Sequence, residues 1–520
     1  MDTDESLNTL TDQNGTTFEI VKSTQVGQPD TSFKNSHDFG SYQVHIEDTS
    51  SGVGGFNTKI FENLNLFMHA PVTEPVNVVG ELTAKSPLTQ FFDDLLVENR
   101  LSSNQKLVLG EGPSPLSIET AQSNIFDGLV EVSRTGKGLL NMSYEEENKM
   151  LKHFFKKLLP LLDAHPRSPW PDLALRYCDF DVARSCFISL ACIHIYESRE
   201  GGKEYYKKGI DHIHSTMNHL IDSISTSDAT SQSEDGANSI HIRSFVILVL
   251  VNVHILFAVL EKGKSSLARY LLKVFASLCN GQDFYDSLKD NENKLSLVLV
   301  LSWYDTVSAI VSPDCRLPFC SPEWYGTMND DFSTLKMMGC PGEIFKAMLE
   351  VCYLRHEIHE GRMDDDERFE AELDRVKLQL MCYREYINYD SDQNYVLQLK
   401  GAQCWSLAVY VSALRLFKNE QRQNAISAAV NEFIDIYGSI PSLSPTVTQM
   451  VWPVYAIGCE CVSKSEREAL HGYMVKLYEV AQMGTLYLLR WIVEQVWERG
   501  ITQEEVLQEW LEDRVDYLPL

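Results

Sequence analysis

Residues 143–162, which read SYEEENKMLKHFFKKLLPLL, mark the point at which the character of the chain changes. Ser143 and Glu146 have the spacing of a capping box, in which a hydroxyl and a carboxylate together cap the first turn of a helix. Ser463 with Glu466, and Thr502 with Glu505, have the same spacing. After Ser143, apolar residues recur at the 3.6-residue period of an amphipathic helix. Pro160 is expected to kink this helix or to end it, because proline cannot donate to the helical hydrogen-bond ladder.

The same periodicity continues to the C-terminus. Further helices are predicted at residues 181–196, 204–224, 240–261, 264–279, 294–311, 341 onward, 364 onward, 395–417, 421–437, 447–461, 465–481, 485–498 and 502–511. Residues 225–239 are polar and are predicted to form an internal linker, and the prolines of 312–332 predict irregular structure there. No segment alternates apolar and polar residues for long enough to build a sheet. The predicted fold class is therefore all-α, a large multi-helix bundle or array of antiparallel helices.

The most apolar run of the chain extends from Phe245 to Leu260. Asn252 and His254 interrupt it, and it is shorter than the ~20 residues that a membrane span needs. We therefore interpret it as a core helix of a protein that does not cross a membrane.

Composition limits the class of partner. The 520 residues include 45 Lys and Arg against 73 Asp and Glu, which gives a net charge of −28 and argues against a surface that binds nucleic-acid phosphates. Hydrophobic residues make up 44% of the chain, enough for a large core. The 12 cysteines form no CxxC pair, and this usage predicts reduced, buried thiols in the cytosol or nucleus.

Residues 1–120 differ from the rest, being rich in polar residues, proline and glycine. They are predicted to form a mostly disordered acidic tail, and 121–520 a helical regulatory domain. Within the tail, 88–101 has the acidic-hydrophobic composition of an activation segment, or forms a short helix that docks on the helical domain. The segment's central residues are Phe91, Phe92, Asp93, Asp94, Leu95 and Leu96.

Motifs for catalysis and for metal or nucleotide binding are missing. No phosphate-binding glycine loop and no nucleophile elbow occurs. His212, His214 and His219 lack a partner at metal-ligand spacing and are predicted to lie on a solvated helix face. Asp305 is expected to accept structural hydrogen bonds rather than to act as a catalytic acid, because buried carboxylates are usually paired. No catalytic residue and no metal site is predicted, and the chain is not expected to be an enzyme.

Several segments, taken in order, resemble one known family. They are LKHFF at 151–155, LLPLL at 158–162, ARSCFISLACIH at 183–194, LSWYD at 301–305, MGCPGEI at 338–344, VWPVYAIGCE at 451–460 and IVEQVW at 492–497. Together they resemble the fungal-specific transcription factor domain, the helical regulatory region of fungal zinc binuclear-cluster transcription factors.

The resemblance implies a nuclear regulator of RNA polymerase II genes. In related regulators the helical region represses, dimerises or senses a small molecule, and some sterol-uptake regulators bind a lipid there. The implied partners are transcriptional co-regulators or a DNA-binding partner, a second copy of the chain, and a small-molecule effector. The first cysteine is Cys178, so these 520 residues do not contain the family's six-cysteine zinc cluster, and no cofactor and no direct DNA contact is expected in this chain. Two explanations are open: the cluster lies upstream of these residues, or the protein is a cluster-less relative that acts through a partner.

A second interpretation remains open at this point. A kinetochore subunit is known with the same helical architecture, so a structural or scaffold protein is the alternative interpretation. Chromatin occupancy separates the two hypotheses, because a transcription regulator occupies promoters whereas a kinetochore subunit is restricted to centromeres.

Overall fold

The computed structural model divides the chain into two units, residues 1–48 and 49–520. The described residues are 10–11, 17–18, 142–162, 181–225, 234–281, 285–286, 288, 292–326, 334, 340–363, 366–381, 393–417, 419–442, 444–510 and 515–520. In the first unit, β1 (Leu10–Thr11) pairs antiparallel with β2 (Thr17–Phe18). The predicted activation segment, 88–101, lies outside the described residues.

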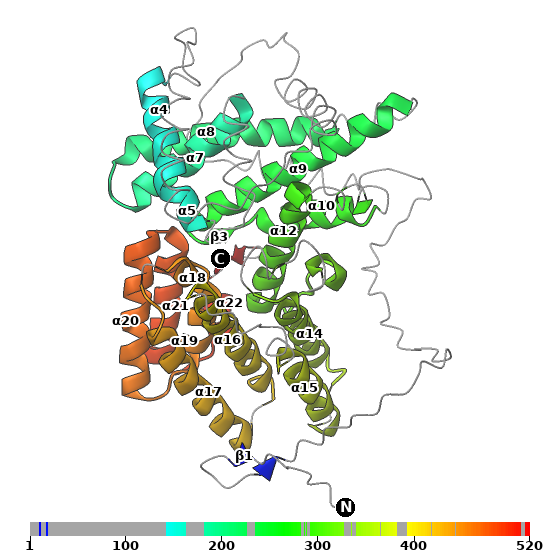
Figure 1. The fold of residues 1–520 in the computed structure, drawn as a ribbon, viewed down its shortest axis with the longest axis vertical. Coiled ribbons are helices and arrows are strands. Elements are labelled where there is room, and N and C mark those ends of the chain that lie inside the picture. Colours follow the sequence, from blue (N-terminus) through cyan, green and yellow to red (C-terminus); the bar gives the residue numbers. More distant parts are fainter. Residues whose placement is uncertain are drawn as a thin grey trace, which may run out of the picture. The chain divides into compact units, whose positions relative to one another are not determined.

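The first helices of the helical unit include a hairpin, against which the others pack (Figure 1). They are α4 (Tyr144–His153), the π-helical turn η2 (Phe154–Leu158), α5 (Leu159–Leu162), α7 (Asp181–Glu197), α8 (Lys203–Ser225) and α9 (Glu234–Glu261). The capping box is confirmed, since the Glu146 amide donates to Ser143 Oγ at 3.3 Å and the Ser143 amide donates to Glu146 Oε2 at 3.1 Å. Pro160 follows the widened π turn, which accommodates the proline without ending the helix. Helices α7 and α8 form the hairpin, and α9 packs on both.

The elements that follow α9 in the middle of the chain are β3 (Lys264–Ser265), α10 (Ala268–Cys279), α12 (Glu292–Val311), the 3₁₀ turn η4 (Pro322–Tyr325), α14 (Gly342–His359) and α15 (Asp366–Met381). Of these, α10 and α12 pack against α9. Among the described residues, one stretch, Ser244–Glu261, has the length and mean hydropathy (2.3) to span a membrane, yet 83% of it is buried inside the fold. His254, within it, donates from Nδ1 to the Leu250 carbonyl at 2.7 Å, which satisfies a polar group in an apolar environment. Such burial agrees with the predicted core helix.

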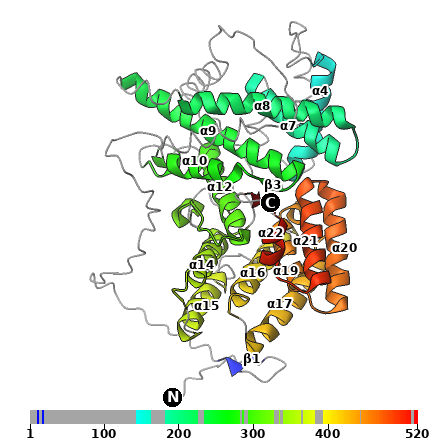
Figure 2. The same ribbon diagram turned by 180° about the vertical axis from the view of Figure 1, so that it is seen from behind.

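The C-terminal helices complete the unit. They are α16 (Gln393–Leu414), α17 (Glu420–Gly438), α18 (Pro445–Thr448), α19 (Val451–Cys459), α20 (Lys464–Ala481), α21 (Gly484–Arg499) and α22 (Gln503–Trp510), followed by β4 (Asp516–Tyr517). Strand β4 returns to pair antiparallel with β3. Figures 1 and 2 show α20 and α21 side by side. In the core, the Trp405 and Trp452 rings stack with centroids 5.3 Å apart. Over the described residues the all-α prediction is confirmed, since strands are limited to two-residue pairs.

Several boundaries differ from the sequence prediction. The helix predicted to begin at residue 264 begins as α10 at Ala268, because Lys264–Ser265 pair as β3 with β4. The helix predicted over 447–461 is divided between α18 and α19. Helix α9 begins at Glu234, so residues 234–239 of the predicted linker are helical, and 226–233 lie outside the described residues. Glu234 and Asp235 carry negative charge at the positive end of the helix dipole, which favours a helix start that apolar periodicity alone does not mark. In the predicted irregular segment, Pro322 opens the short turn η4.

The described cysteines behave as the sequence predicts. All ten are free thiols, and eight of them are buried. Cys178 and Cys382 lie outside the described residues.

Candidate functional site

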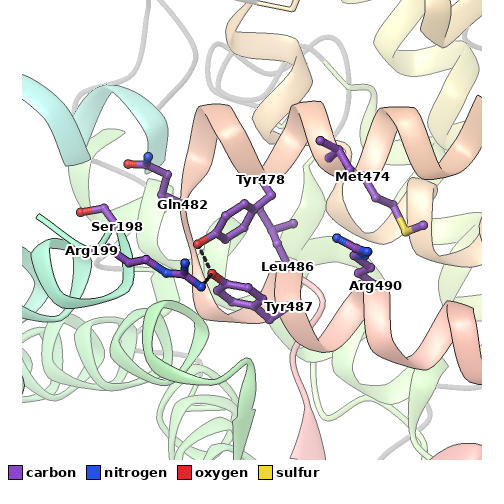
Figure 3. A pocket seen from close by; sticks show the side chains of 9 residues that line it. Ser198, Arg199, Met474, Tyr478, Gln482, Leu486, Tyr487 and Arg490 are labelled. Carbon is purple, nitrogen blue, oxygen red and sulfur yellow. Dashed lines mark hydrogen bonds between the residues drawn. The ribbon is translucent and has the colours of Figure 1, made fainter.

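A cavity of about 390 Å³ lies where the connection between α7 and α8 meets the hairpin of α20 and α21 (Figure 3). It is lined by Ser198, Arg199, Met474, Val475, Tyr478, Gln482, Leu486, Tyr487 and Arg490. Its volume falls within the range of pockets that hold small organic ligands, about 300–1,000 Å³. The cavity therefore brings together two segments that are far apart in the sequence.

Arg199 reaches the cavity because of the way α7 ends. The Glu200 amide donates to the Ile195 carbonyl at 3.1 Å and the Arg199 amide donates to the Tyr196 carbonyl at 3.1 Å. These two bonds form a Schellman motif, which places Arg199 in the left-handed region with φ of 58°. Glycine normally occupies this position because a Cβ atom is strained there.

Helix α20 ends on the opposite wall in a related way. The Gln482 amide donates to the Tyr478 carbonyl at 2.8 Å, and Gln482 is left-handed with φ of 51°. This single bond is the αL form of helix termination, in which glycine is again the usual residue. Two strained, non-glycine helix ends thus line one cavity.

A hydrogen-bonded network joins the two walls (Figure 3). The Arg199 guanidinium donates to the Tyr487 hydroxyl at 3.2 Å, and the hydroxyls of Tyr487 and Tyr478 are hydrogen-bonded to each other. The Tyr478 hydroxyl also lies 3.4 Å from the Glu197 carbonyl. Burial, together with the bond to Tyr487, raises the pKa of Tyr478, so this phenol stays protonated and available as a donor.

The charge of the cavity is opposite to that of the chain. Its lining includes two arginines and no aspartate or glutamate, although the protein as a whole carries −28. Arg490 forms an ion pair with Glu494 at 2.7 Å, both side chains being partly exposed to solvent. Glu197 is the last residue of α7, two positions before Arg199. Burial, and then the charge of Glu261, raise the pKa of Glu197 to about 7. The cavity is therefore locally suited to an anion.

Two buried histidines are hydrogen-bonded to the end of α20, next to the cavity-lining Gln482. His194 donates from Nε2 to the Ala481 carbonyl at 3.2 Å, so its Nδ1 accepts from His153 Nε2 at 2.7 Å. Burial and the neighbouring His194 lower the pKa of His153 to about 4, which keeps the pair neutral. Because Ala481 precedes Gln482, this chain of bonds fixes the end of α20 against α4 and α7.

Comparison with known proteins assigns the helical unit. Residues 143–516 match the model of the fungal specific transcription factor domain. The chain belongs to this family. No curated protein and no solved structure matches the chain. The match begins at the capping-box serine and extends through α22, so the resemblance predicted from the sequence is confirmed and the cavity lies inside the family's domain.

Asp305, of the family-like LSWYD segment, lies in the core and not at the cavity. Its side chain is fully buried and accepts from Arg316 Nη1 at 2.9 Å, from the Cys320 amide at 2.8 Å and from the Phe319 amide. Burial raises the pKa of Asp305. The predicted structural role is confirmed, because these donors tie the loop after α12 to the helix.

The prediction of a solvated face is wrong for His212. Its side chain is buried, and its Nδ1 lies 3.3 Å from Ser185 Oγ, because this face of α8 packs against α7. His214 is exposed. Over the described part of the chain no group of three or more metal-ligating side chains comes together.

The cavity is not predictable from the sequence. Arg199, Tyr478 and Tyr487 are ordinary surface-type residues in the sequence, and only the tertiary fold brings them together. The one available signal is local, since α7 and α20 each end at a position where glycine is expected and a long polar side chain stands instead. A left-handed residue other than glycine carries some backbone strain, and such positions cluster at functional sites.

Proposed function

We propose that the protein is a nuclear transcription regulator of RNA polymerase II genes, and that its helical region is an effector and dimerisation unit without catalytic activity. The observation that carries this proposal is the family match over residues 143–516. The net charge of −28 supports action through protein partners, because an acidic surface repels nucleic-acid phosphates. The proposed partners are transcriptional co-regulators and a DNA-binding protein.

The acidic-hydrophobic segment 88–101 is the proposed activating element. Its acidic residues keep the neighbouring aromatic and aliphatic side chains solvated until a co-regulator's apolar groove accepts them. The helical region restrains this segment, and an effector bound to the helical region changes the restraint. Such coupling requires a ligand that binds the two states of the protein with different affinity.

A reporter assay with the full chain tests the proposal. The chain is fused to a heterologous DNA-binding module, and Phe91, Phe92, Leu95 and Leu96 are replaced together by alanine. The matched control replaces Phe61, Leu64, Leu66 and Phe67, an equally apolar set outside the proposed segment. Reporter output should fall to background in the first variant only. Equal output from both variants would rule out the activating role of 88–101.

Chromatin mapping of the unmodified protein tests the broader assignment. Promoter occupancy is expected for a regulator of RNA polymerase II genes. Occupancy restricted to centromeres would contradict it and favour a scaffold role.

A further inference from the structure

We propose that the cavity between α7 and the α20–α21 hairpin binds a small organic anion with an apolar body, such as an aryl or branched-alkyl carboxylate. Arg199, Tyr487 and Arg490 would hold the anionic group, and Met474 and Leu486 would contact the body. Binding follows from the geometry of the cavity alone, whereas its regulatory meaning rests on the proposed function.

The charge argument begins at Arg199. Within the described residues its guanidinium forms no ion pair, and its hydrogen-bond partner is the neutral Tyr487 phenol. Core arginines of the same fold are matched by carboxylates instead; Arg415, for example, contacts Glu504 at 2.5 Å and Glu460 at 3.0 Å. A guanidinium with three or more unused donors at an open cavity is suited to a carboxylate, which accepts two parallel bonds.

Arg490 adds a second positive charge on the same helix face. Tyr487 and Arg490 are three residues apart on α21, so both side chains lie on one side of the helix (Figure 3). The ion pair of Arg490 with Glu494 is partly exposed, and exposed pairs contribute little, so a ligand anion competes for Arg490 at small cost.

The shape of the cavity selects against an inorganic anion. The Tyr478 and Tyr487 rings lie with centroids 4.4 Å apart, and Met474, Val475 and Leu486 complete an apolar wall. A volume of about 390 Å³ exceeds what a phosphate or sulfate fills. A ligand with an aromatic or branched body covers this wall and removes apolar surface from water.

Backbone strain gives an independent argument for a ligand. Arg199 and Gln482 both hold the left-handed conformation that glycine adopts more easily, and both line the cavity. Strain of this kind persists at ligand-binding sites, where the side chain contributes more than an unstrained helix end would. A ligand that contacts both residues ties the end of α7 to the end of α20.

Fluorine NMR on the full chain tests this proposal with a defined probe. The probe is 4-(trifluoromethyl)phenylacetate, and its neutral control is the corresponding phenylacetamide, which has the same body without the charge. The carboxylate should bind saturably and about tenfold or more tightly than the amide. Arg199→Gln should weaken carboxylate binding by about tenfold or more and leave amide binding unchanged. Inorganic phosphate in equal excess should not displace the probe.

Matched variants make the outcome decisive. Arg499→Gln removes a comparably exposed arginine at the other end of α21 and should bind the probe as the unmodified protein does. Equal affinity for carboxylate and amide, an unchanged affinity in Arg199→Gln, or displacement by phosphate would overturn the proposal. Because the readout is binding by the purified protein, its failure leaves the reporter assay of the proposed function unaffected.

Discussion

Two sets of helix ends in this protein solve the same geometric problem differently. Helices α9, α14 and α21 are each followed by a left-handed glycine, at Gly263, Gly361 and Gly500, with φ of 66–68°. Helices α7 and α20 instead carry Arg199 and Gln482 at φ of 58° and 51°. Glycine adopts this conformation without strain, whereas a side chain costs about 1 kcal/mol there.

The difference distinguishes glycines that only end a helix from longer side chains that end a helix and also line the cavity. A Cβ atom at Gly361 or Gly500 would meet nothing within 4 Å, so nothing but backbone conformation favours glycine at these ends. The two ends with long polar side chains both border the cavity. A third left-handed residue, Cys315, lies away from the cavity, and its carbonyl accepts from His356 Nδ1 at 3.0 Å. The two left-handed helix ends that carry long polar side chains, Arg199 and Gln482, are therefore the ones that line the cavity.

The largest expected effect is at Gly263. Alanine there combines left-handed strain with a collision, since its Cβ would lie 2.5 Å from the Thr485 Cα. The free energy of unfolding of Gly263→Ala should fall by about 3 kcal/mol or more, because backbone at the start of α21 must move. Urea denaturation followed by circular dichroism measures it. A loss below about 1 kcal/mol would mean that α21 is not held against this turn.

The glycine ends in open surroundings should show strain alone. Gly361→Gln and Gly500→Gln should each lower the free energy of unfolding by about 1 kcal/mol, since nothing surrounds the new side chain. The same denaturation experiment applies, with Gly472 replaced by alanine as a control for generic glycine effects; Gly472 lies inside α20, and a Cβ atom there would meet nothing within 4 Å. Gly472→Ala should stabilise the protein, because glycine disfavours a helix interior. An unchanged stability in both left-handed variants would remove the basis of the comparison.

The reverse exchange at the cavity should stabilise the protein. Gln482→Gly relieves the strain at the end of α20 and should raise the free energy of unfolding by about 0.5–1 kcal/mol, part of the gain being lost to the more flexible unfolded chain. Gln482→Ala keeps the Cβ and should remain within about 0.3 kcal/mol of the unmodified protein. A destabilised glycine variant would show that the Gln482 side chain stabilises the fold itself.

The smallest effect is a pH dependence at the end of α7. The pKa of Glu197 is raised to about 7, above its ordinary value of 4.5, so the folded state favours the protonated carboxyl. The free energy of unfolding should therefore decrease as pH rises from about 4.5 to 7, by no more than about 1 kcal/mol because solvent screens a half-buried charge. Glu197→Gln should remove this decrease, and Glu468→Gln, at an exposed site, should not. An identical pH profile in both variants would contradict the assignment.

Local rules explain how much the sequence could predict. The capping boxes at Ser143, Ser463 and Thr502 occur as predicted, because each depends on residues three positions apart. The structural role of Asp305 is predictable from the sequence, because a carboxylate on an apolar helix needs buried donors. The family resemblance rests on short segments that occur in the family's order along the chain, and the family match confirms it.

The cavity depends on information that no local pattern contains. Arg199 and Tyr487 are 288 residues apart in the chain, and His153 and His194 are 41 apart. The buried position of His212 likewise reflects which face of α8 meets α7. Periodicity predicts that a face is buried but not which polar side chains meet across the interface.

The measurement that tests the central claim most directly combines stability and binding in one variant. Arg199→Gly/Gln482→Gly should unfold at a higher urea concentration than the unmodified protein, since both strained ends are relaxed. The same preparation should bind 4-(trifluoromethyl)phenylacetate about tenfold or more weakly in fluorine NMR. A variant that is more stable and binds the carboxylate with unchanged affinity would contradict the claim that the Arg199 side chain holds the anion and that Gln482, at the other strained end, contributes to the same cavity.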